Sequence, residues 1–495
     1  MLGPRGPRKI VRFAPAAQDL GRGFTGLALG GVFLAAVWGF AALQTGDSPK
    51  GVFIVLAGIV GGYMALNIGA NDVANNVGPA VGCRALTMVG ALVIAAVFEA
   101  LGAIVAGGDV VATISKGIID PSLIAETDIF IAAMLAALLA SALWINLATY
   151  IGAPVSTTHA VVGGVMGAGI AAAGIGVVDG GTMAKIAASW VISPVLGGVV
   201  AALFLGFVKF AIIDREDQIA AAGRWVPILV ALMAGVFSAY LIMKGLKRVW
   251  TPDKWLVALL ALAVFAGAYA VLKPLVARRA QGMEDPDRSL HGLFIIPLIC
   301  SAALLSFAHG SNDVANAVGP LSAIVGAAHS GGVTAKVGIP PWVMIIGAVG
   351  ISAGLILYGP KLIRTVGEEI TRLNPIRAYC AVLSAAITVI AASALGLPVS
   401  STHIAVGAVF GVGFFREYFA NRRALRTAGS SRWNPEAATG KNPKSASGNG
   451  PRRPRRKLVR RAHLITILAA WVVTVPVTAV MAGGLFLMVR TFLSV

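Results

Sequence analysis

Stretches of about 20 consecutive apolar residues recur along most of the 495-residue chain, and they constrain its fold more than any other feature. A stretch of that length crosses the hydrocarbon core of a bilayer, about 30 Å thick, as an α-helix. Hydrophobic residues make up 57% of the chain and charged residues 12%, and the mean hydropathy is +0.83. A soluble domain carries about twice that share of charge. We therefore predict an all-α polytopic membrane protein with about 11–13 membrane segments.

The net charge of +19 is concentrated near the C-terminus. Residues 416–461 hold 14 Lys and Arg residues against two acids, among many Gly, Ser, Pro and Asn residues. This composition is typical of a disordered loop, and its charge favours the cytoplasmic side of a membrane over a nucleic-acid partner. The three cysteines have no metal-ligand spacing. The basic N-terminal tail precedes a first membrane helix and not a cleavable signal.

Two polar motifs inside apolar sequence each occur twice. "NDVANNVGP" (71–79) recurs as "NDVANAVGP" (312–320), and "GAPVSTTH" (152–159) recurs as "GLPVSSTH" (396–403), at offsets of 241 and 244 residues. Two motifs that keep nearly the same spacing indicate an internal duplication. Three predicted spans separate the copies, and the basic loop follows only the second. We therefore predict two inverted-topology repeats, which are typical of secondary transporters.

The predicted organisation follows from these features. It consists of a basic cytoplasmic N-terminal tail (1–23), an extra transmembrane helix (24–45), repeat 1 (51–180), linking transmembrane helices (183–290), repeat 2 (291–415), a basic disordered cytoplasmic loop (416–463) and a last transmembrane helix (464–490). The segments 155–173 and 402–415 are short or glycine-rich. Each is either a full crossing or one arm of a re-entrant hairpin with discontinuous helices.

Both motifs contain prolines that affect the helices around them. Gly78-Pro79 and Gly319-Pro320 are predicted to break their helices, because proline lacks the N–H and clashes with the preceding turn. Pro154 and Pro398 are predicted to begin helices whose first turn carries hydroxyl groups. A helix start presents free N–H groups and a positive dipole end, which bind anions. Two inverted copies could therefore surround a small tetrahedral oxyanion.

Three intramembrane acids require a partner. Asp72 and Asp313 cannot contact an anion as bare carboxylates, because like charges repel strongly in a low-dielectric pocket. They must be protonated or paired with cations when the anion is bound, and this requirement couples the two. Glu99 aligns with Ile351 in the other copy, so it could serve an ion site in one half only.

The sequence gives less support to proton transfer by histidines and to enzyme catalysis. His159 and His403 are interpreted either as proton carriers or as helix-packing residues. No nucleophile-elbow or phosphate-loop pattern accompanies the Ser, His and Asp residues. We therefore predict no enzyme activity and no organic cofactor.

With these motifs the chain resembles the inorganic phosphate transporter (PiT) family of secondary transporters. The resemblance rests on "GANDVANNVGPAVG" with "PVSTTHAVVGG", and on "SFAHGSNDVANAVGPL" with "GLPVSSTHIAVGAVFGVG". It covers residues 51–180 and 291–415. It implies cation-coupled uptake of inorganic phosphate by an inverted-repeat fold that works by alternating access.

The resemblance also implies roles for individual residues. Substrate binding is expected at Asn75, Ser156, Thr157, Thr158, Asn316, Ser400, Ser401 and Thr402. Cation binding is expected at Asn71, Asp72, Glu99, Asn312 and Asp313, with sodium at the two Asp residues. One departure concerns the second half, where many members have a Glu and this chain has Val382. Stoichiometry or the cation itself could therefore differ here.

The resulting prediction is a cation:phosphate symporter of an inner or plasma membrane, with its N-terminus and residues 416–461 in the cytoplasm. Its partners are inorganic phosphate, a coupling cation (Na⁺ or H⁺) and the lipid bilayer. The alternative is a permease for sulfate or another tetrahedral oxyanion, and less favoured interpretations are an anion channel or a phosphate sensor. The oligomeric state is open, a homodimer included.

Overall fold

The computed structural model describes the chain except residues 1–13, 47, 125, 152–154, 246–249, 282–285, 331–337, 366–372, 431–460 and 494–495. In the described part all regular elements are helices, apart from one isolated bridge between Ile119 and Val178. Eleven of these helices are long and apolar enough to cross a membrane. The predicted class, an all-α polytopic membrane protein, is confirmed.

The helices follow one another in this order: α1 (Ala14–Leu43), α2 (Gly51–Gly82), α3 (Met88–Ala106), α4 (Gly108–Lys116), η1 (Pro121–Leu123), α5 (Thr127–Ile151), α6 (Thr157–Ala173), η2 (Ile175–Val177), α7 (Gly180–Val208), η3 (Lys209–Ile213), α8 (Gln218–Tyr240), η4 (Leu241–Gly245), α9 (Lys254–Ala280), α10 (Pro286–Leu293), α11 (Ile295–Ser330), α12 (Pro341–Thr365), α13 (Pro375–Ala394), α14 (Ser401–Ser430) and α15 (Arg461–Leu493).

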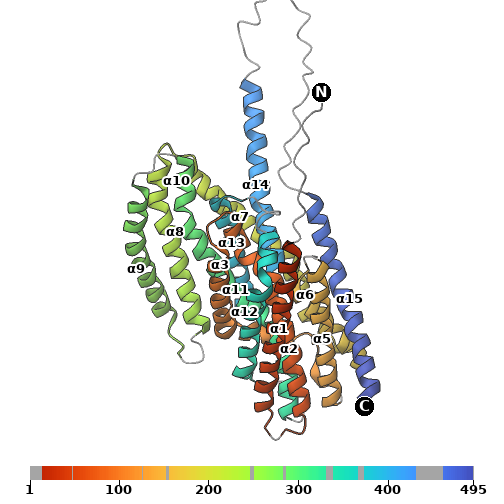
Figure 1. Cartoon of the computed structure of the whole chain (residues 1–495). Helices are drawn as coiled ribbons and strands as arrows, with labels where there is room; N and C mark the ends of the chain where they lie inside the picture. The colour runs from red at the N-terminus through yellow and green to blue at the C-terminus, as the bar shows by residue number, and fades with distance from the viewer. Residues whose placement is uncertain are drawn as a thin grey trace, which may run out of the picture.

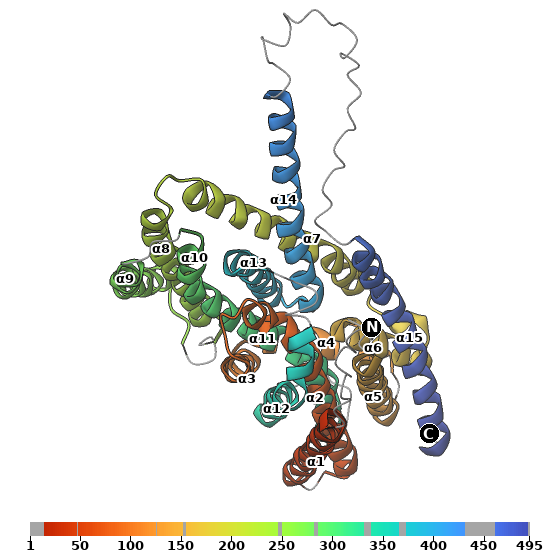
Figure 2. The ribbon, with the colours of Figure 1, turned by 45° about the horizontal axis from the view of Figure 1, so that its top comes forward.

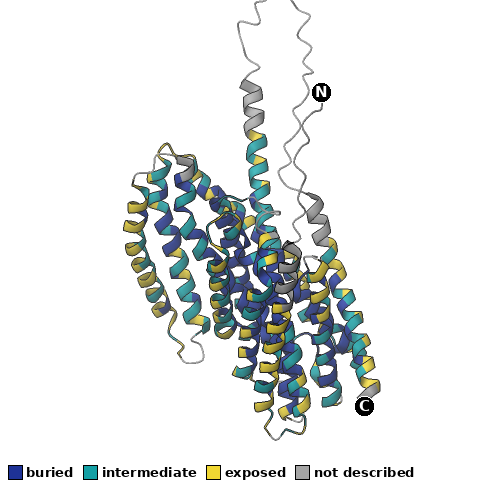
Figure 3. Ribbon diagram, viewed as in Figure 1, coloured by how far each residue is buried: buried dark blue, intermediate teal, exposed yellow. Residues whose placement is uncertain are grey.

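The two helices that carry the NDVAN motif, α2 and α11, lie at the centre of the molecule and are buried over much of their length (Figures 1 and 3). They are antiparallel, because Gly61 of α2 packs on Leu321 of α11 whereas Asp72 lies beside His309. The two copies of the motif therefore enter the centre of the protein from opposite ends.

The predicted helix breaks at the Gly-Pro pairs are wrong. Helix α2 continues through Pro79 and α11 continues through Pro320. A proline inside a helix removes one backbone hydrogen bond and strains the preceding turn. Neighbouring helices can offset this cost, and the close packing around α2 and α11 does so. The carbonyls of Asn75 and Asn316, four residues before the prolines, consequently lose their usual helical donor.

Reciprocal backbone contacts relate the two halves. A methyl group on Gly69 would lie 2.0 Å from the carbonyl oxygen of Ile351, and one on Gly310 would lie 2.0 Å from that of Glu99. Gly69 and Gly310 are equivalent by the 241-residue offset, and Glu99 and Ile351 are equivalent by an offset of 252. The same reciprocity holds for the contacts of Gly354 with Leu66 and of Gly102 with Phe307. These matched contacts favour the predicted inverted repeat.

Two helical hairpins, α5–α6 and α13–α14, reach the centre from opposite ends. The hairpin α5–α6 starts beside the beginning of α2, where Lys50 pairs with Asp128 at 2.6 Å. The hairpin α13–α14 starts beside α10, which precedes α11, where the side chains of Asn374 and His291 are 2.9 Å apart. Since α2 and α11 are antiparallel, the hairpins point toward each other. Helix α6, in the segment 155–173, is thus the second arm of such a hairpin.

Several predicted boundaries require correction. Helix α14 continues past the predicted end at 415 to Ser430, and α15 already begins at Arg461, so the ends of the predicted loop 416–463 are helical. Residues 416–430 include four Arg and three Ala residues, which favour helix. Helix α1 likewise begins at Ala14, inside the predicted tail 1–23. The remainder of the predicted loop, 431–460, lies outside the described residues.

Helices α8, α9 and α10 form a separate group beside the central body (Figure 2). Along α9, Val257 and Val276 are the residues that are buried; the others are exposed or half-buried, and between Trp255 and Leu275 most of them are apolar. This pattern is typical of a helix that faces lipid. The functional groups of the protein therefore lie in the central body, between α2, α11 and the two hairpin tips.

Candidate functional site

The second helix of each hairpin begins with a serine cap. Ser156 Oγ accepts a hydrogen bond from the backbone N–H of His159 at 3.2 Å, and Ser400 Oγ accepts one from that of His403 at 3.3 Å. Serine suits this position because its hydroxyl pairs with an otherwise free N–H of the first turn. Helix α14 therefore starts at Ser401, and the prediction that Pro398 begins it is wrong. The equivalent Pro154 lies outside the described residues.

The first turn of each of these helices contacts a carboxylate of the NDVAN motif. The hydroxyl of Thr157 donates to Asp72 at 3.1 Å, and that of Ser401 donates to Asp313 at 3.0 Å. Thr402 donates to the other oxygen of Asp72 at 3.0 Å. All five side chains are buried. The structure thus brings the predicted carboxylates and hydroxyls together at one point.

Two amides link each copy to the other. Asn75 of the first copy donates to the hydroxyl of Thr402 in the second copy at 2.9 Å. Asn316 of the second copy donates to the hydroxyls of Thr157 and Thr158 in the first at 3.3 and 3.2 Å. The hydroxyl of Thr158 in turn donates to the carbonyl of Val399 at 3.0 Å, so the two tips touch. The site is therefore shared between both repeats.

The first asparagine of each motif lies at the edge of this cluster. Asn71 donates to Thr149 of α5 at 2.8 Å. Asn312 donates to Ser393 and to the carbonyl of Leu397 at 3.0 and 3.1 Å, and its oxygen accepts from the N–H of Val399 at 3.2 Å. These contacts fasten each motif helix to the hairpin of its own repeat. They give cation binding by Asn71 and Asn312 no support, and that role stays a prediction.

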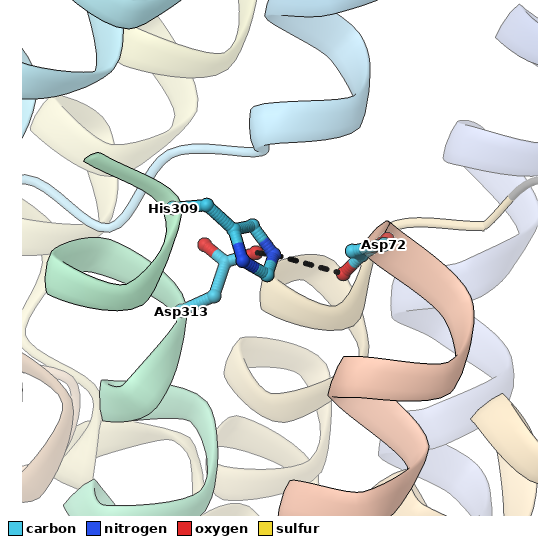
Figure 4. Close-up of side chains that lie close together, drawn as sticks. All are labelled: Asp72, His309 and Asp313. Atoms are coloured by element: carbon cyan, nitrogen blue, oxygen red, sulfur yellow. Dashed lines mark ion pairs between the residues drawn. The ribbon is translucent and has the colours of Figure 1, made fainter. Parts of the chain in front are cut away.

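His309 lies between the carboxylates, and the predictions from sequence gave it no role. Its Nε2 is 3.0 Å from Asp313 Oδ2 and 3.8 Å from Asp72 Oδ2 (Figure 4). Its Nδ1 is 3.2 Å from Glu99 Oε2. Two signals in the sequence could have found it: it precedes Asp313 by one helical turn, and Ile68 takes its place in the first copy.

Glu99 and His309 belong to a polar cluster that exists in one half only. Asn76 donates to Glu99 Oε1 at 2.8 Å, and Glu99 contacts His309. We call Asn76, Glu99 and His309 the polar triad. By the repeat offsets their equivalents are Ala317, Ile351 and Ile68, all buried, which we call the apolar counterpart.

The carboxylates of this site lack a cationic side chain other than His309. In the described part of the chain no Lys or Arg forms an ion pair with Asp72, Glu99 or Asp313. Ligand atoms of Asp72, His309 and Asp313 lie within 4.8 Å of one another. At an effective dielectric constant of 20, two unit charges at that distance repel by about 3–4 kcal/mol. A bound cation or proton would remove this repulsion.

Several buried oxygen atoms of the site also need a partner. Among the described residues, Asp313 Oδ1, Asn316 Oδ1 and Asn76 Oδ1 have no hydrogen-bond donor. A buried polar atom without a partner costs about 1–3 kcal/mol. Carboxylate and amide oxygens are ligands that hard cations prefer. The donor set therefore suits a small hard cation beside the two Asp residues.

The two histidines of the hairpins pack behind the tips. The rings of His159 and His403 lie edge to face with centroids 4.5 Å apart, and the ring of His159 lies 3.8 Å from that of Trp190. Trp190 Nε1 also donates to the carbonyl of Pro398 at 3.2 Å, which holds the turn before α14. These contacts favour the packing interpretation over the proton-carrier one.

Comparison with known proteins agrees with this geometry. Residues 68–482 match the phosphate transporter family. A protein of Helicobacter pylori (strain J99) named "Putative phosphate permease" is 50% identical over 425 residues, which are 85% of this chain and 80% of that protein. One of Pyrococcus abyssi with the same description is 37% identical over 375 residues, 75% of this chain and 91% of its own.

A solved structure has the same fold. It is titled "The sodium-dependent phosphate transporter", superimposes with a TM-score of 0.78 at 33% identity, and covers 89% of this chain and 99% of its own. The fold and the family indicate a permease and not an enzyme. The chain is a multi-pass membrane protein that belongs to the phosphate transporter family.

Proposed function

We propose that the protein is a cation-coupled symporter that carries inorganic phosphate across an inner or plasma membrane by alternating access. The family and the similar solved structure support phosphate as the substrate. One observation carries the proposal. Two helix starts, one from each repeat, meet two carboxylates that have no cationic partner except His309 among the described residues, at a point fully buried in the protein.

Phosphate binding would exchange hydrogen bonds that already exist. The hydroxyls of Thr157, Ser401 and Thr402 donate to Asp72 and Asp313. A phosphate between the two hairpin tips would accept these donors instead, together with N–H groups of the first turns of α6 and α14. The amides of Asn75 and Asn316 already reach the same hydroxyls and would complete the shell. Ser156 and Ser400 contribute by holding the helix starts in place.

In this exchange the carboxylates lose their hydrogen-bond donors, and cations would take the place of these donors. Asp72 and Asp313 would each face a sodium ion when phosphate is bound, and Glu99 would add a third acid in one half. The sodium-dependent name of the similar solved structure supports sodium over protons. The second half supplies no further acid at the position of Val382, which is buried in α13. Coupling follows because phosphate cannot enter beside two bare carboxylates without uncompensated negative charge, and bound cations remove that charge.

Alternating access is supported by the burial of the site and by the directions of the hairpins. Asp72 and Asp313 are 0% and 1% exposed, so the site is closed to both ends of the protein. Because the hairpins come from opposite ends, movement of one hairpin would open the site to one side only. If a cycle moves net positive charge inward, the membrane potential adds about 2.3 kcal/mol per charge per 100 mV.

The proposed orientation places the basic segment 416–461 and the N-terminus in the cytoplasm. Helix α1 is antiparallel to α2, because Gly58 packs on Ala41 and Gly62 on Val37. The start of α1 therefore lies at the end where α11 and α13 begin and where α14 leaves the body (Figure 1). Both basic segments share one end, as the positive-inside rule requires.

Uptake of labelled phosphate into proteoliposomes tests the proposal. Uptake against the phosphate gradient is expected with an inward sodium gradient and not without it, and a proton gradient alone is expected to be weaker. Phosphate uptake that depends on neither the sodium nor the proton gradient would contradict symport and indicate a channel. Sulfate in excess should leave phosphate uptake intact; equal competition would instead indicate a general oxyanion permease.

A further inference from the structure

Helix α4 (Gly108–Lys116) is separated from α3 by Gly107, whereas the equivalent glycine in the other copy lies inside a helix described as far as Thr365. Gly107 interrupts the chain between α3 and α4, and its equivalent at the 252-residue offset, Gly359, lies inside the continuous helix α12. A methyl group on Gly107 would lie 2.6 Å from Val314, and one on Gly359 would lie 2.8 Å from the equivalent Val73. The packing is matched, yet among the described residues only the first copy has a helix break at this glycine.

Polar contacts hold α4 against the tip of the second hairpin. Lys244, on η4 at the end of α8, donates to Asp109 Oδ2 at 2.6 Å and to the carbonyl of Ala394 at 2.8 Å. We call these two contacts the Lys244 bridge. The hydroxyl of Thr113 donates to the carbonyl of Gly396 at 2.7 Å. One short helix is thus connected both to a linking helix outside the repeats and to the turn that leads into α14.

The apolar side of α4 covers α11 beyond the site. Val110, Val111 and Ile114 are buried, and Ile114 packs on Gly319, two turns past Asp313. This part of α11 runs toward the turn before α2, where Ser48 donates to the carbonyl of Ala328 at 3.2 Å. Helix α4 therefore lies between the site and the end of the protein opposite to the C-terminus of α14.

Polar side chains connect the Lys244 bridge with the site. The Tyr240 hydroxyl interacts with Ser311, and Ser311 lies 3.4 Å from the hydroxyl of Ser393. Ser393 accepts from Asn312, which holds the turn before α14. At the surface, Asp109 and Lys244 are 43% and 27% exposed. An ion that moved past α4 toward Asp313 would contact these polar side chains and not only apolar ones.

We propose that α4 is the gate at this end of the transporter and that the Lys244 bridge keeps it closed. The gate rests on the alternating-access function proposed above. Opening requires that the Lys244 bridge and the Thr113–Gly396 hydrogen bond break, with Gly107 and Gly117 as the flanking hinges. In the proposed orientation this is the gate on the non-cytoplasmic side.

Accessibility of a single cysteine tests the gate. Val111→Cys, on the buried side of α4, is introduced after the native Cys83, Cys300 and Cys380 are replaced by Ala. Reaction with a membrane-impermeant maleimide in sealed vesicles is expected to be slow, and Lys244→Gln should accelerate it at least tenfold. The acceleration should occur only when the reagent is on the side of residues 250–253. Equal labelling rates with and without Lys244→Gln would overturn the proposal.

Three further measurements sharpen the test of the gate. Lys209→Gln removes an ion pair with Asp214 at the opposite end and should leave the rate unchanged. Lys244→Arg keeps the charge and should keep labelling slow; fast labelling with Arg would contradict the bridge. Labelling needs no transport. Gradient-independent phosphate uptake together with Lys244-dependent labelling would reject symport alone, whereas coupled uptake with Lys244-independent labelling would reject the gate alone.

Discussion

The polar triad and its apolar counterpart occupy equivalent places in the two halves and differ in every side chain. The backbones around them match, since Gly310 packs on Glu99 as Gly69 packs on Ile351. In one half the space holds Asn76, Glu99 and His309; in the other it is filled by hydrocarbon. The duplication therefore preserved the scaffold and the shared binding groups, while the charged cluster exists once.

This difference shows which buried polar groups the protein keeps although they lower its stability. Burying an acid and a histidine costs several kcal/mol unless each is well paired. The apolar counterpart demonstrates that the same backbone packs without them. Intramembrane charges that the fold does not require point to function. We expect the symmetric hydroxyls and amides to hold phosphate, the symmetric carboxylates to face cations, and the one-sided groups to set how many cations accompany phosphate.

The largest effect is expected from the symmetric carboxylates. Asp72→Asn and Asp313→Asn should each reduce sodium-driven phosphate uptake in proteoliposomes at least 100-fold, because the neutral amide cannot balance the charge of a bound cation. Both proteins should still insert and elute as the wild type does from size exclusion. The matched control is Asp214→Asn, an exposed member of an ion pair, which should keep full uptake. Near-normal uptake in either site variant would remove the role assigned to that residue.

The next prediction concerns the two equivalent backbone contacts, which a methyl group at either glycine would disrupt. Gly69→Ala and Gly310→Ala should each lower the free energy of unfolding by about 3 kcal/mol, because the new methyl group would lie 2.0 Å from a carbonyl oxygen. Thermal unfolding in detergent measures both. Gly39→Ala, with nothing within 4 Å, is the control and should have no such effect. A large effect at one site only would show that the two contacts are not equivalent.

Replacing residues of the polar triad by those of the apolar counterpart tests whether the charged cluster is needed for coupling. His309→Ile should reduce coupled uptake about 30-fold, the equivalent of about 2 kcal/mol, and it should also destabilise the protein because Glu99 loses a buried partner. Adding Glu99→Ile should restore thermal stability, since Ile68 and Ile351 pack in the same place. Coupled uptake should stay low in the double variant. Full uptake there would show that the triad is dispensable.

The smallest effect is expected at the edge of the triad. Asn76→Ala introduces the residue that the other copy has at position 317, and it removes one hydrogen bond to Glu99. A few-fold loss of uptake and about 1–2 kcal/mol of stability are expected. The sodium dependence of uptake should shift with it. A loss as large as that of His309→Ile would place Asn76 in direct contact with an ion.

Much of the site could be predicted because its residues lie in two repeated motifs. The repeats identified both Asp residues, the amides of Asn75 and Asn316 and the hydroxyls after each hairpin turn, and the structure brings all of them together. The unpaired position of Glu99 was also readable from the repeat alignment. His309 was missed because two of its three partners, Asp72 and Glu99, lie on other helices, and the sequence shows only its one-turn spacing to Asp313.

The wrong predictions share a physical cause. Local rules for proline predicted helix breaks at Pro79 and Pro320 and a helix start at Pro398. Tertiary packing decided otherwise, because α2 and α11 are buried around Pro79 and Pro320, and Trp190 holds the turn at Pro398. The helical part of the predicted loop also shows that high charge alone does not prevent a helix where good helix formers follow a packed segment.

By itself the sequence determined the membrane class, the duplication and the chemistry of the binding groups, because hydrophobic length, spacing and residue type are properties of the chain alone. Only the tertiary structure decided which groups face one another. Antiparallel packing of α2 on α11 brings Asp72 to Asp313 and places His309 between them, and α4 packs against α11 beyond the site. Such contacts join residues more than 200 positions apart, and their geometry depends on how whole helices pack.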